Sequence, residues 1–295
     1  MSRENVKVTD MRIHPGDSGF LIDDGKTAIL IDSGYGFTGF RMAEKIKEHL
    51  GDRPLDFIFL THSHYDHALG SAYILESYPN ATVVAGAYAA SIFRRAGALR
   101  KMEELDRSIA AISGVTDYPF LGEKLRVDIE VNDGDVVKAG DLTFIVMDLP
   151  GHTKCSVGLY CPEEAMLIAT ETLGIYDGGE VILPSFLVSY EGTIASIDRA
   201  LALKIDRLLI PHLGDLEEKR TRFYLDNIKR RSIESMEEYA AALREGKSAE
   251  EIATDYIKRY RKGYVEKIYP PEAMMLNTTL MINRIGLEFG VIEEG

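Results

Sequence analysis

One short segment constrains the fold more than any other, because three of the chain's seven histidines lie within six residues and are interleaved with an aspartate. The segment is Thr61-His62-Ser63-His64-Tyr65-Asp66-His67, and it directly follows Phe57-Ile58-Phe59-Leu60, an apolar run of the length expected for a buried strand. Imidazole nitrogens and carboxylate oxygens suit zinc, iron or manganese, and a loop at a strand end lets neighbouring side chains converge. The segment therefore predicts a metal site at the end of a buried strand.

Strand and helix patterns alternate through the first two thirds of the chain. Residues 5–32 read as short strands with a turn at Asp23-Asp24-Gly25, and residues 38–50 carry apolar residues at four-residue spacing, which predicts a helix. Further helices are expected at about 68–77 and over 87–112, and further strands at 81–85, 129–131, 141–148, 156–160 and 166–169. This alternation predicts a layered α/β domain.

The character of the sequence changes after the run Leu208-Leu209-Ile210-Pro211-His212. Residues 216–260 are rich in Glu, Lys, Arg, Ala and Leu without a strand signal, which predicts two or three amphipathic helices. Pro270-Pro271 interrupts this pattern, and residues 272–285 predict one last helix. We therefore expect a domain over residues 1–215 and a helical cap or extension over residues 216–295.

Composition narrows the classes of function. A chain of 295 residues with 45% hydrophobic residues can bury a full core, and its net charge of −13 repels phosphate backbones and anionic lipid, which disfavours nucleic-acid and membrane partners. The first residues lack the apolar stretch of a signal peptide and no run of eighteen apolar residues occurs, so a cytoplasmic protein is expected. Cys155 and Cys161 are expected to be two reduced cysteines.

Three more metal-donor residues follow predicted strands elsewhere in the chain. His152 lies between two strands, Glu171 follows the run Met166-Leu167-Ile168-Ala169, and His212 follows Leu208-Leu209-Ile210. A single histidine in such a loop is more often structural or solvated than a ligand. Together with the first cluster, however, the three residues complete two sets of ligands.

The order of these residues resembles the five motifs of the metallo-β-lactamase superfamily over residues 12–214. The resemblance implies a four-layer αββα sandwich with a site for two divalent metal ions, zinc, iron or manganese, at the sheet edges. It implies ligands as follows: His62, His64 and His152 for the first ion, Asp66, His67 and His212 for the second, Glu171 as the bridge, and Asp32 behind them to orient a ligand.

Two positions depart from the family pattern. The bridging residue of the family is an aspartate after glycine, whereas this chain has Glu171 after Thr170. The last family motif is Pro-Gly-His-Gly, whereas this chain has Pro211-His212-Leu213-Gly214. Either His212 reaches the metal through an altered loop, or that ligand position is vacant and the second metal site is weak.

The function implied by the resemblance is hydrolysis. Two metal ions would activate a hydroxide that attacks the carbonyl of an ester, thioester or amide, and Asp66 could accept the water's proton. The run THSHYDHALG and the helical tail resemble the thioesterases of the bacterial quinolone-signal response, in which tail helices cap the active site. This likeness implies a thioesterase or esterase whose small-molecule substrate is selected by residues after 216, although a lactonase or phosphodiesterase would use the same ligands.

Two other classes of function remain as alternatives. A flavodiiron-like oxidoreductase has glutamate where this chain has His64, and it needs a flavodoxin domain for which residues 216–295 are too short and too helical. A regulatory, metal-binding pseudoenzyme would account for the unusual Glu171 and His212. Tyr65 and Asn277 are candidates for a substrate pocket, although both also suit ordinary packing. The sequence leaves open whether the chain forms a homodimer.

Overall fold

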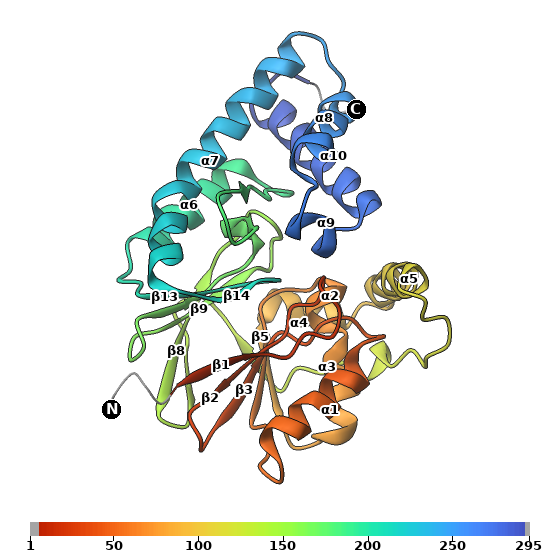
Figure 1. The fold of residues 1–295 in the computed structure, drawn as a ribbon, viewed down its shortest axis with the longest axis vertical. Coiled ribbons are helices and arrows are strands. Elements are labelled where there is room, and N and C mark those ends of the chain that lie inside the picture. Colours follow the sequence, from red (N-terminus) through yellow and green to blue (C-terminus); the bar gives the residue numbers. More distant parts are fainter. Residues whose placement is uncertain (1–5, 293–295) are drawn as a thin grey trace. The chain divides into compact units, whose positions relative to one another are not determined.

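The computed structural model describes residues 6–292, which fold into α/β structure arranged as two compact units. Unit 1 consists of the residues up to Met147 together with Val157–Glu164. Unit 2 consists of Asp148–Ser156 and the residues from Ala165 onwards. Figure 1 shows the helices and strands of both units along the chain.

Unit 1 contains a six-stranded mixed sheet with the strand order β1-β2-β3-β4-β5-β6. Its strands are β1 Lys7–Asp10, β2 Phe20–Asp23, β3 Ala28–Ile31, β4 Phe57–Leu60, β5 Thr82–Gly86 and β6 Ile129–Val131. The first three strands pair antiparallel, and the strands from β3 to β6 pair in parallel. Because β3 and β4 are covered on both faces, their sequences are continuous apolar runs, which explains why β4 is readable from the sequence.

Helices and a β-hairpin complete unit 1. The helices are α1 Gly39–Leu50, α2 Tyr65–Ala68, α3 Gly70–Ser77, α4 Ala87–Phe93 and α5 Ala96–Ile112, with a 3-10 helix at Gly122–Lys124. The remaining strands are β7 Val136–Ala139, β8 Leu142–Asp148 and β9 Val157–Cys161. β7 and β8 form an antiparallel pair, and the rings of Phe59 in β4 and Phe144 in β8 lie 5.3 Å apart. The hairpin therefore shares its apolar core with the six-stranded sheet.

Unit 2 begins with short strands around one helix. Its elements are β10 Met166–Ile168, a 3-10 helix at Glu171–Leu173, β11 Ile175–Tyr176, β12 Ile182–Leu183, α6 Tyr190–Leu201, β13 Arg207–Ile210 and β14 Gly214–Leu216. β10 and β13 run parallel, and β14 returns antiparallel to β13. The parallel pairing brings the ends of β10 and β13 to the same edge, which places the segments that follow them close together.

Four more helices follow β14 in unit 2: α7 Glu218–Arg244, α8 Ala249–Tyr260, α9 Tyr264–Ile268 and α10 Pro271–Glu288. Ser248 starts α8 with a capping box in which Glu251 returns the hydrogen bond. α8 packs on α10, and α7 packs on α6 and β12. Buried side chains of these helices, such as Tyr239 and Ile282, share one apolar cluster with Phe186 and Tyr190. The helical tail is therefore packed onto the strand-containing part of its own unit.

The structure confirms the expected α/β class and refines the expected elements. Residues 87–112 form two helices instead of one, because the backbone of Arg95 is extended. Residues 216–260 form two helices. The short elements α9, β7, β11, β12 and β14 were not expected, since elements of two to five residues carry too little periodicity. The helix α6, which has twelve residues, was also not expected. The two compact units do not separate at residue 216. The boundary between a domain over 1–215 and an extension stays a prediction.

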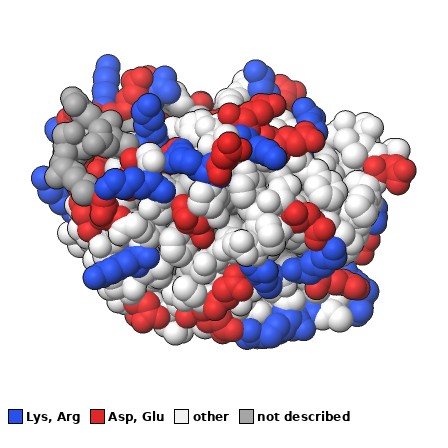
Figure 2. Space-filling model, turned by 90° about the horizontal axis from the view of Figure 1, so that it is seen from below, with Lys and Arg blue, Asp and Glu red and all other residues white. Residues whose placement is uncertain are grey.

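Three further observations bear on the composition. Both cysteines are buried, and neither is part of a disulfide in the described residues. Among residues 6–292, no helix combines the length and apolar character needed to cross a membrane. Figure 2 shows acidic and basic side chains interspersed on the face that it draws. Ion pairs of the described residues include that of Lys229 with Asp198.

Candidate metal centre

The histidine cluster of unit 1 follows β4 and leads into α2. His62 is fully buried, and its ring centroid lies 4.6 Å from that of His64 and 4.1 Å from that of His67. Asp66 lies in the first turn of α2, with its Oδ2 3.8 Å from Nε2 of His67. Three imidazoles and a carboxylate therefore meet within one loop and one helical turn.

Asp32 lies behind this cluster, directly after β3. Its Oδ2 is 2.7 Å from Nδ1 of His67, and its two oxygens also accept hydrogen bonds from the hydroxyls of Ser18 and Thr61 and from the backbone N–H of Thr61. A carboxylate at Nδ1 fixes the orientation of the ring and leaves Nε2 as the nitrogen that faces Asp66. The structure thus places Asp32 where it orients His67.

The backbone around the cluster is held closely. The carbonyl of His67 accepts hydrogen bonds from the N–H (2.7 Å) and the hydroxyl (2.8 Å) of Ser33. Gly70, at the start of α3, lies so near that a Cβ there would be 1.8 Å from the carbonyl oxygen of Ser33. Only glycine fits such an approach, so the start of α3 and the loop after β3 are locked together.

The loop after β3 is braced by two buried carboxylates. Asp17 accepts a hydrogen bond from the N–H of Tyr35, and Asp106 accepts one from the N–H of Gly36 and another from the hydroxyl of Tyr118. Burial raises the pKa of Asp106 to about 6, although these hydrogen bonds oppose the shift. Burial also raises the pKa of Asp17. The loop after β3 is therefore held by two carboxyl groups, Asp17 and Asp106, whose ionised form is disfavoured by burial.

Tyr65 is the aromatic residue inside the cluster. Its side chain is half-buried, and its ring centroid lies 5.6 Å from that of Tyr35. Burial, and then the negative charge of Asp66, raise the pKa of Tyr35 well above its ordinary value, so the Tyr35 phenol stays neutral. Tyr65 thus packs on a neutral ring, and its place in a substrate pocket stays a prediction.

In unit 2, His152 follows the end of β8 and is held at two points. Its N–H donates to the hydroxyl of Thr172 (3.1 Å), which in turn donates to the carbonyl of Leu149 (2.7 Å). Its Nδ1 lies 2.9 Å from the hydroxyl and 3.2 Å from the carbonyl oxygen of Ser185. Because a carbonyl only accepts, this environment favours a proton on Nδ1 and leaves the Nε2 lone pair for a metal.

Glu171 and His212 are brought together in the same unit. Glu171 is buried and begins the 3-10 helix after β10, which Thr170 caps by accepting a hydrogen bond from the N–H of Thr172. His212 lies in the three-residue loop between β13 and β14, with a backbone φ of +61°. Its Nε2 is 3.0 Å from Oε1 of Glu171. The two residues that depart from the expected motifs are therefore in direct contact.

Sequence reasoning did not find several residues that hold these side chains. Thr172 and Ser185 fix His152, and the hydroxyls of Tyr224 and Tyr264 reach backbone carbonyls beside Glu171 and His212. None of the four belongs to a motif with fixed spacing, and a single hydroxyl residue in a loop or helix carries no local signal of such a role.

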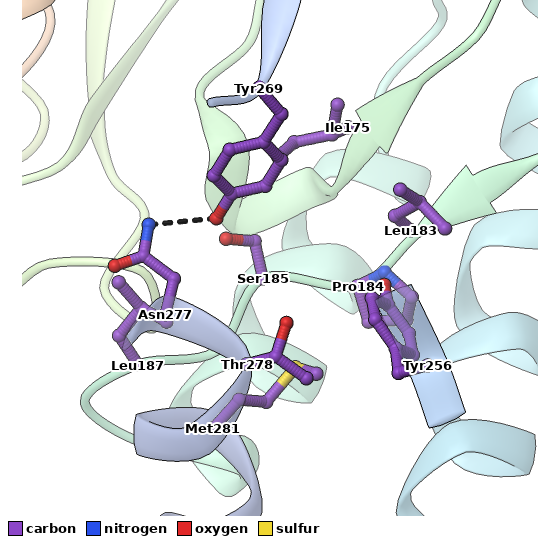
Figure 3. A pocket seen from close by; sticks show the side chains of 10 residues that line it. All are labelled: Ile175, Leu183, Pro184, Ser185, Leu187, Tyr256, Tyr269, Asn277, Thr278 and Met281. Carbon is purple, nitrogen blue, oxygen red and sulfur yellow. Dashed lines mark hydrogen bonds between the residues drawn. The ribbon is translucent and has the colours of Figure 1, made fainter. Parts of the chain in front are cut away.

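A small pocket lies in unit 2 beside the segment that holds His152 (Figure 3). Its lining consists of Ile175, Leu183, Pro184, Ser185, Leu187, Tyr256, Tyr269, Asn277, Thr278 and Met281. The side-chain amide of Asn277 donates a hydrogen bond of 2.7 Å to the hydroxyl of Tyr269. The wall is mainly apolar with a few polar groups, and the space that it encloses is about that of one water molecule.

Comparison with known proteins identifies related chains. The model of the metallo-beta-lactamase superfamily matches residues 16–212. The chain is 26% identical over 200 residues to the acyl-coenzyme A thioesterase MBLAC2 of Gallus gallus, a match that covers 63% of this chain and 69% of the relative. It is 31% identical over 142 residues to hydroxyacylglutathione hydrolase 1 of Vibrio vulnificus (strain YJ016), covering 48% of this chain and 41% of that protein.

Solved structures show the same fold. The metallo-beta-lactamase family protein TTHA1429 of Thermus thermophilus superimposes with a TM-score of 0.63 at 20% identity, covering 94% of this chain and 90% of that one. The archaeal superfamily protein ST1585 of Sulfolobus tokodaii gives a TM-score of 0.54 at 20% identity, covering 72% of this chain and 80% of the other. The first match extends over most of the helices after residue 216.

Proposed function

Because the chain belongs to the metallo-beta-lactamase superfamily, we propose that it is a hydrolase that uses two metal ions to cleave a small-molecule thioester or ester. The choice of substrate rests on the names of two relatives. One is an acyl-coenzyme A thioesterase and the other a hydroxyacylglutathione hydrolase, and both names describe an acyl group joined to a thiol carrier. A thioester is therefore the first substrate class to test.

The donor residues of the two units fit a metal centre. We propose that they act together, with His62, His64 and His152 holding one divalent ion, Asp66, His67 and His212 the other, and Glu171 bridging. The support is chemical: Nδ1 is held by an oxygen in both His67 and His152, so each ring can offer Nε2. Imidazole and carboxylate donors of this kind suit zinc, iron or manganese.

The chain's own residues would divide the work of hydrolysis. Two such ions, when bound, supply an activated hydroxide at neutral pH and polarise a carbonyl oxygen. Asp66 is the carboxylate best placed to accept a proton, because its side chain is 20% exposed whereas that of Glu171 is 4% exposed. Asp32 keeps His67 oriented, and Ser185 does the same for His152.

We further propose that the helices after residue 216 select the acyl group. Ser185 contacts His152, a proposed metal ligand. Ser185 also lines the small pocket, together with residues of α8 and α10, so this one residue contacts both the pocket and the proposed ligand. The wall of the pocket is mainly apolar, with Asn277 and Tyr269 as polar groups, and its space is about that of one water molecule, so α8 or α10 would have to shift to admit an acyl group.

Elemental analysis and a substrate panel test the proposal. The purified protein is expected to hold two equivalents of metal and to hydrolyse acyl-coenzyme A or acyl-glutathione faster than lactones or phosphodiesters. His64→Ala is expected to lower both the metal content and the rate, the latter by more than about 100-fold. His49→Ala, in which the lost histidine contacts Asp23 instead of the cluster, serves as the matched control and should keep both. A metal-free, inert protein, or an active His64→Ala variant, would refute the metal mechanism.

A further inference from the structure

His212 adopts a backbone conformation that needs support. Its φ of +61° lies in the left-handed region, which is strained for a residue other than glycine. The loop that carries it has only three residues between the paired ends Ile210 and Gly214. A side chain on so short and strained a loop keeps its place only if surrounding groups hold the backbone.

Tyr264 supplies such a contact. It is the first residue of α9, and its hydroxyl donates a hydrogen bond to the carbonyl oxygen of His212. α9 is anchored in turn, because Val265 and Ile268 are buried in the apolar cluster formed with α8 and α10. The phenol that reaches His212 therefore comes from a fixed element of the helical tail.

Tyr224 makes a similar contact beside Glu171. It is a fully buried residue of α7, and its hydroxyl donates to the carbonyl of Leu173 and lies 3.2 Å from that of Gly174. These carbonyls end the 3-10 helix that begins at Glu171, in which the N–H of Gly174 donates to the carbonyl of Glu171. α7 thus holds the turn that presents Glu171.

We propose that Tyr224 and Tyr264 are positioning residues through which the tail helices set the second metal position. Each phenol holds the backbone of one of the two segments, Glu171 and His212, where this chain departs from the family motifs. This role rests on the proposed function, in which both residues bind metal. The tail would then have two tasks, selecting the acyl group and completing the ligand set.

Metal titration of the metal-free protein tests the role. Tyr264→Phe and Tyr224→Phe are expected to weaken the weaker of two binding steps by about 10–100-fold and to leave the tighter step within about twofold. Tyr239→Phe is the matched control, because it removes a buried hydroxyl whose partner is Ser235 of its own helix. It should change the melting temperature without changing either binding step. Unchanged binding in both site variants would overturn the proposal.

Amide hydrogen exchange of the metal-free proteins separates this inference from the proposed function. Tyr264→Phe is expected to speed exchange in residues 211–216 and Tyr224→Phe in residues 171–175, each at least about tenfold, while the other segment stays as in the wild type. If the wild type binds no second metal but this pattern appears, the dinuclear proposal fails and the positioning contacts stand. If neither segment changes, the phenols do not hold the ligand backbone.

Discussion

The proposed ligand residues of unit 1 and those of unit 2 are held in different ways. In unit 1, His62, His64, Asp66 and His67 lie within six consecutive positions, and one buried carboxylate, Asp32, orients the cluster. In unit 2, His152, Glu171 and His212 follow three different strands, and hydroxyl groups from distant loops and helices hold them.

This difference shows two ways of positioning the proposed ligands: by nearness in the sequence, as in unit 1, and by tertiary packing, as in unit 2. The chain itself brings the residues of unit 1 together, so a few local contacts are sufficient to fix them. The residues of unit 2 depend on strand pairing and helix packing, and neutral hydroxyls of Thr172, Ser185, Tyr224 and Tyr264 hold His152 and the backbone beside Glu171 and His212. We therefore expect substitutions in unit 1 to have the larger single effects.

The largest effect is expected from Asp66→Asn in unit 1. The amide keeps the size of the side chain but cannot accept a proton, so kcat should fall by about 10²–10⁴-fold. Steady-state kinetics with an acyl thioester measure the change. Asp177→Asn, which alters an aspartate of a surface turn in unit 2, should leave kcat unchanged. Equal rates for Asp66→Asn and the wild type would remove Asp66 from the proposed chemistry.

The next largest effect is expected from a substitution at Gly70, where the start of α3 lies against the backbone of Ser33. Gly70→Ala would place a Cβ 1.8 Å from the Ser33 carbonyl oxygen, and the free energy of unfolding should fall by about 3 kcal/mol. Gly97→Ala is the control in another helix, where the added Cβ meets only Arg100 at 3.8 Å, and its effect should stay within about 1 kcal/mol. Denaturant unfolding compares the two variants. Similar stabilities would mean that the approach is not tight.

Asp32→Asn weakens the orientation of His67. Asparagine tolerates the φ of +53° at this position, so the backbone should be kept while the negative charge at Nδ1 is lost. Metal affinity should fall by about 10–100-fold, as is usual when such a partner is removed. Competition with a chelator measures the affinity. An unchanged affinity would show that Thr61 and Ser18 alone support the cluster.

Ser185→Ala should have the smallest effect on metal affinity. It removes the hydroxyl at Nδ1 of His152 and is the counterpart in unit 2 of Asp32→Asn, which changes the partner of Nδ1 of His67. Nδ1 of His152 can still donate to the carbonyl oxygen of residue 185, which lies 3.2 Å away, so metal affinity should fall by less than about tenfold. The same chelator titration applies. If Ser185→Ala lowered the metal affinity more than Asp32→Asn does, the larger single effects would lie in unit 2, contrary to our expectation.

Some elements of the fold could be read from single residues and short runs. The buried strand β4 is recognisable as Phe57–Leu60, and α1 is recognisable from the spacing of Met42, Ile46 and Leu50, which are all buried. By contrast, α9 has five residues and β14 has three, so neither shows a period. These short elements exist because neighbouring strands and helices hold them.

The sequence by itself determined the cluster of imidazole and carboxylate donors in unit 1, because its residues are joined by a few peptide bonds directly after a buried strand. It also indicated that His152, Glu171 and His212 follow strands. Only the tertiary structure decided what holds them, including Ser185 at His152 and the phenols of Tyr224 and Tyr264 beside Glu171 and His212. The physical reason is that these contacts join residues 33 to 52 positions apart, and only long-range packing brings such pairs together.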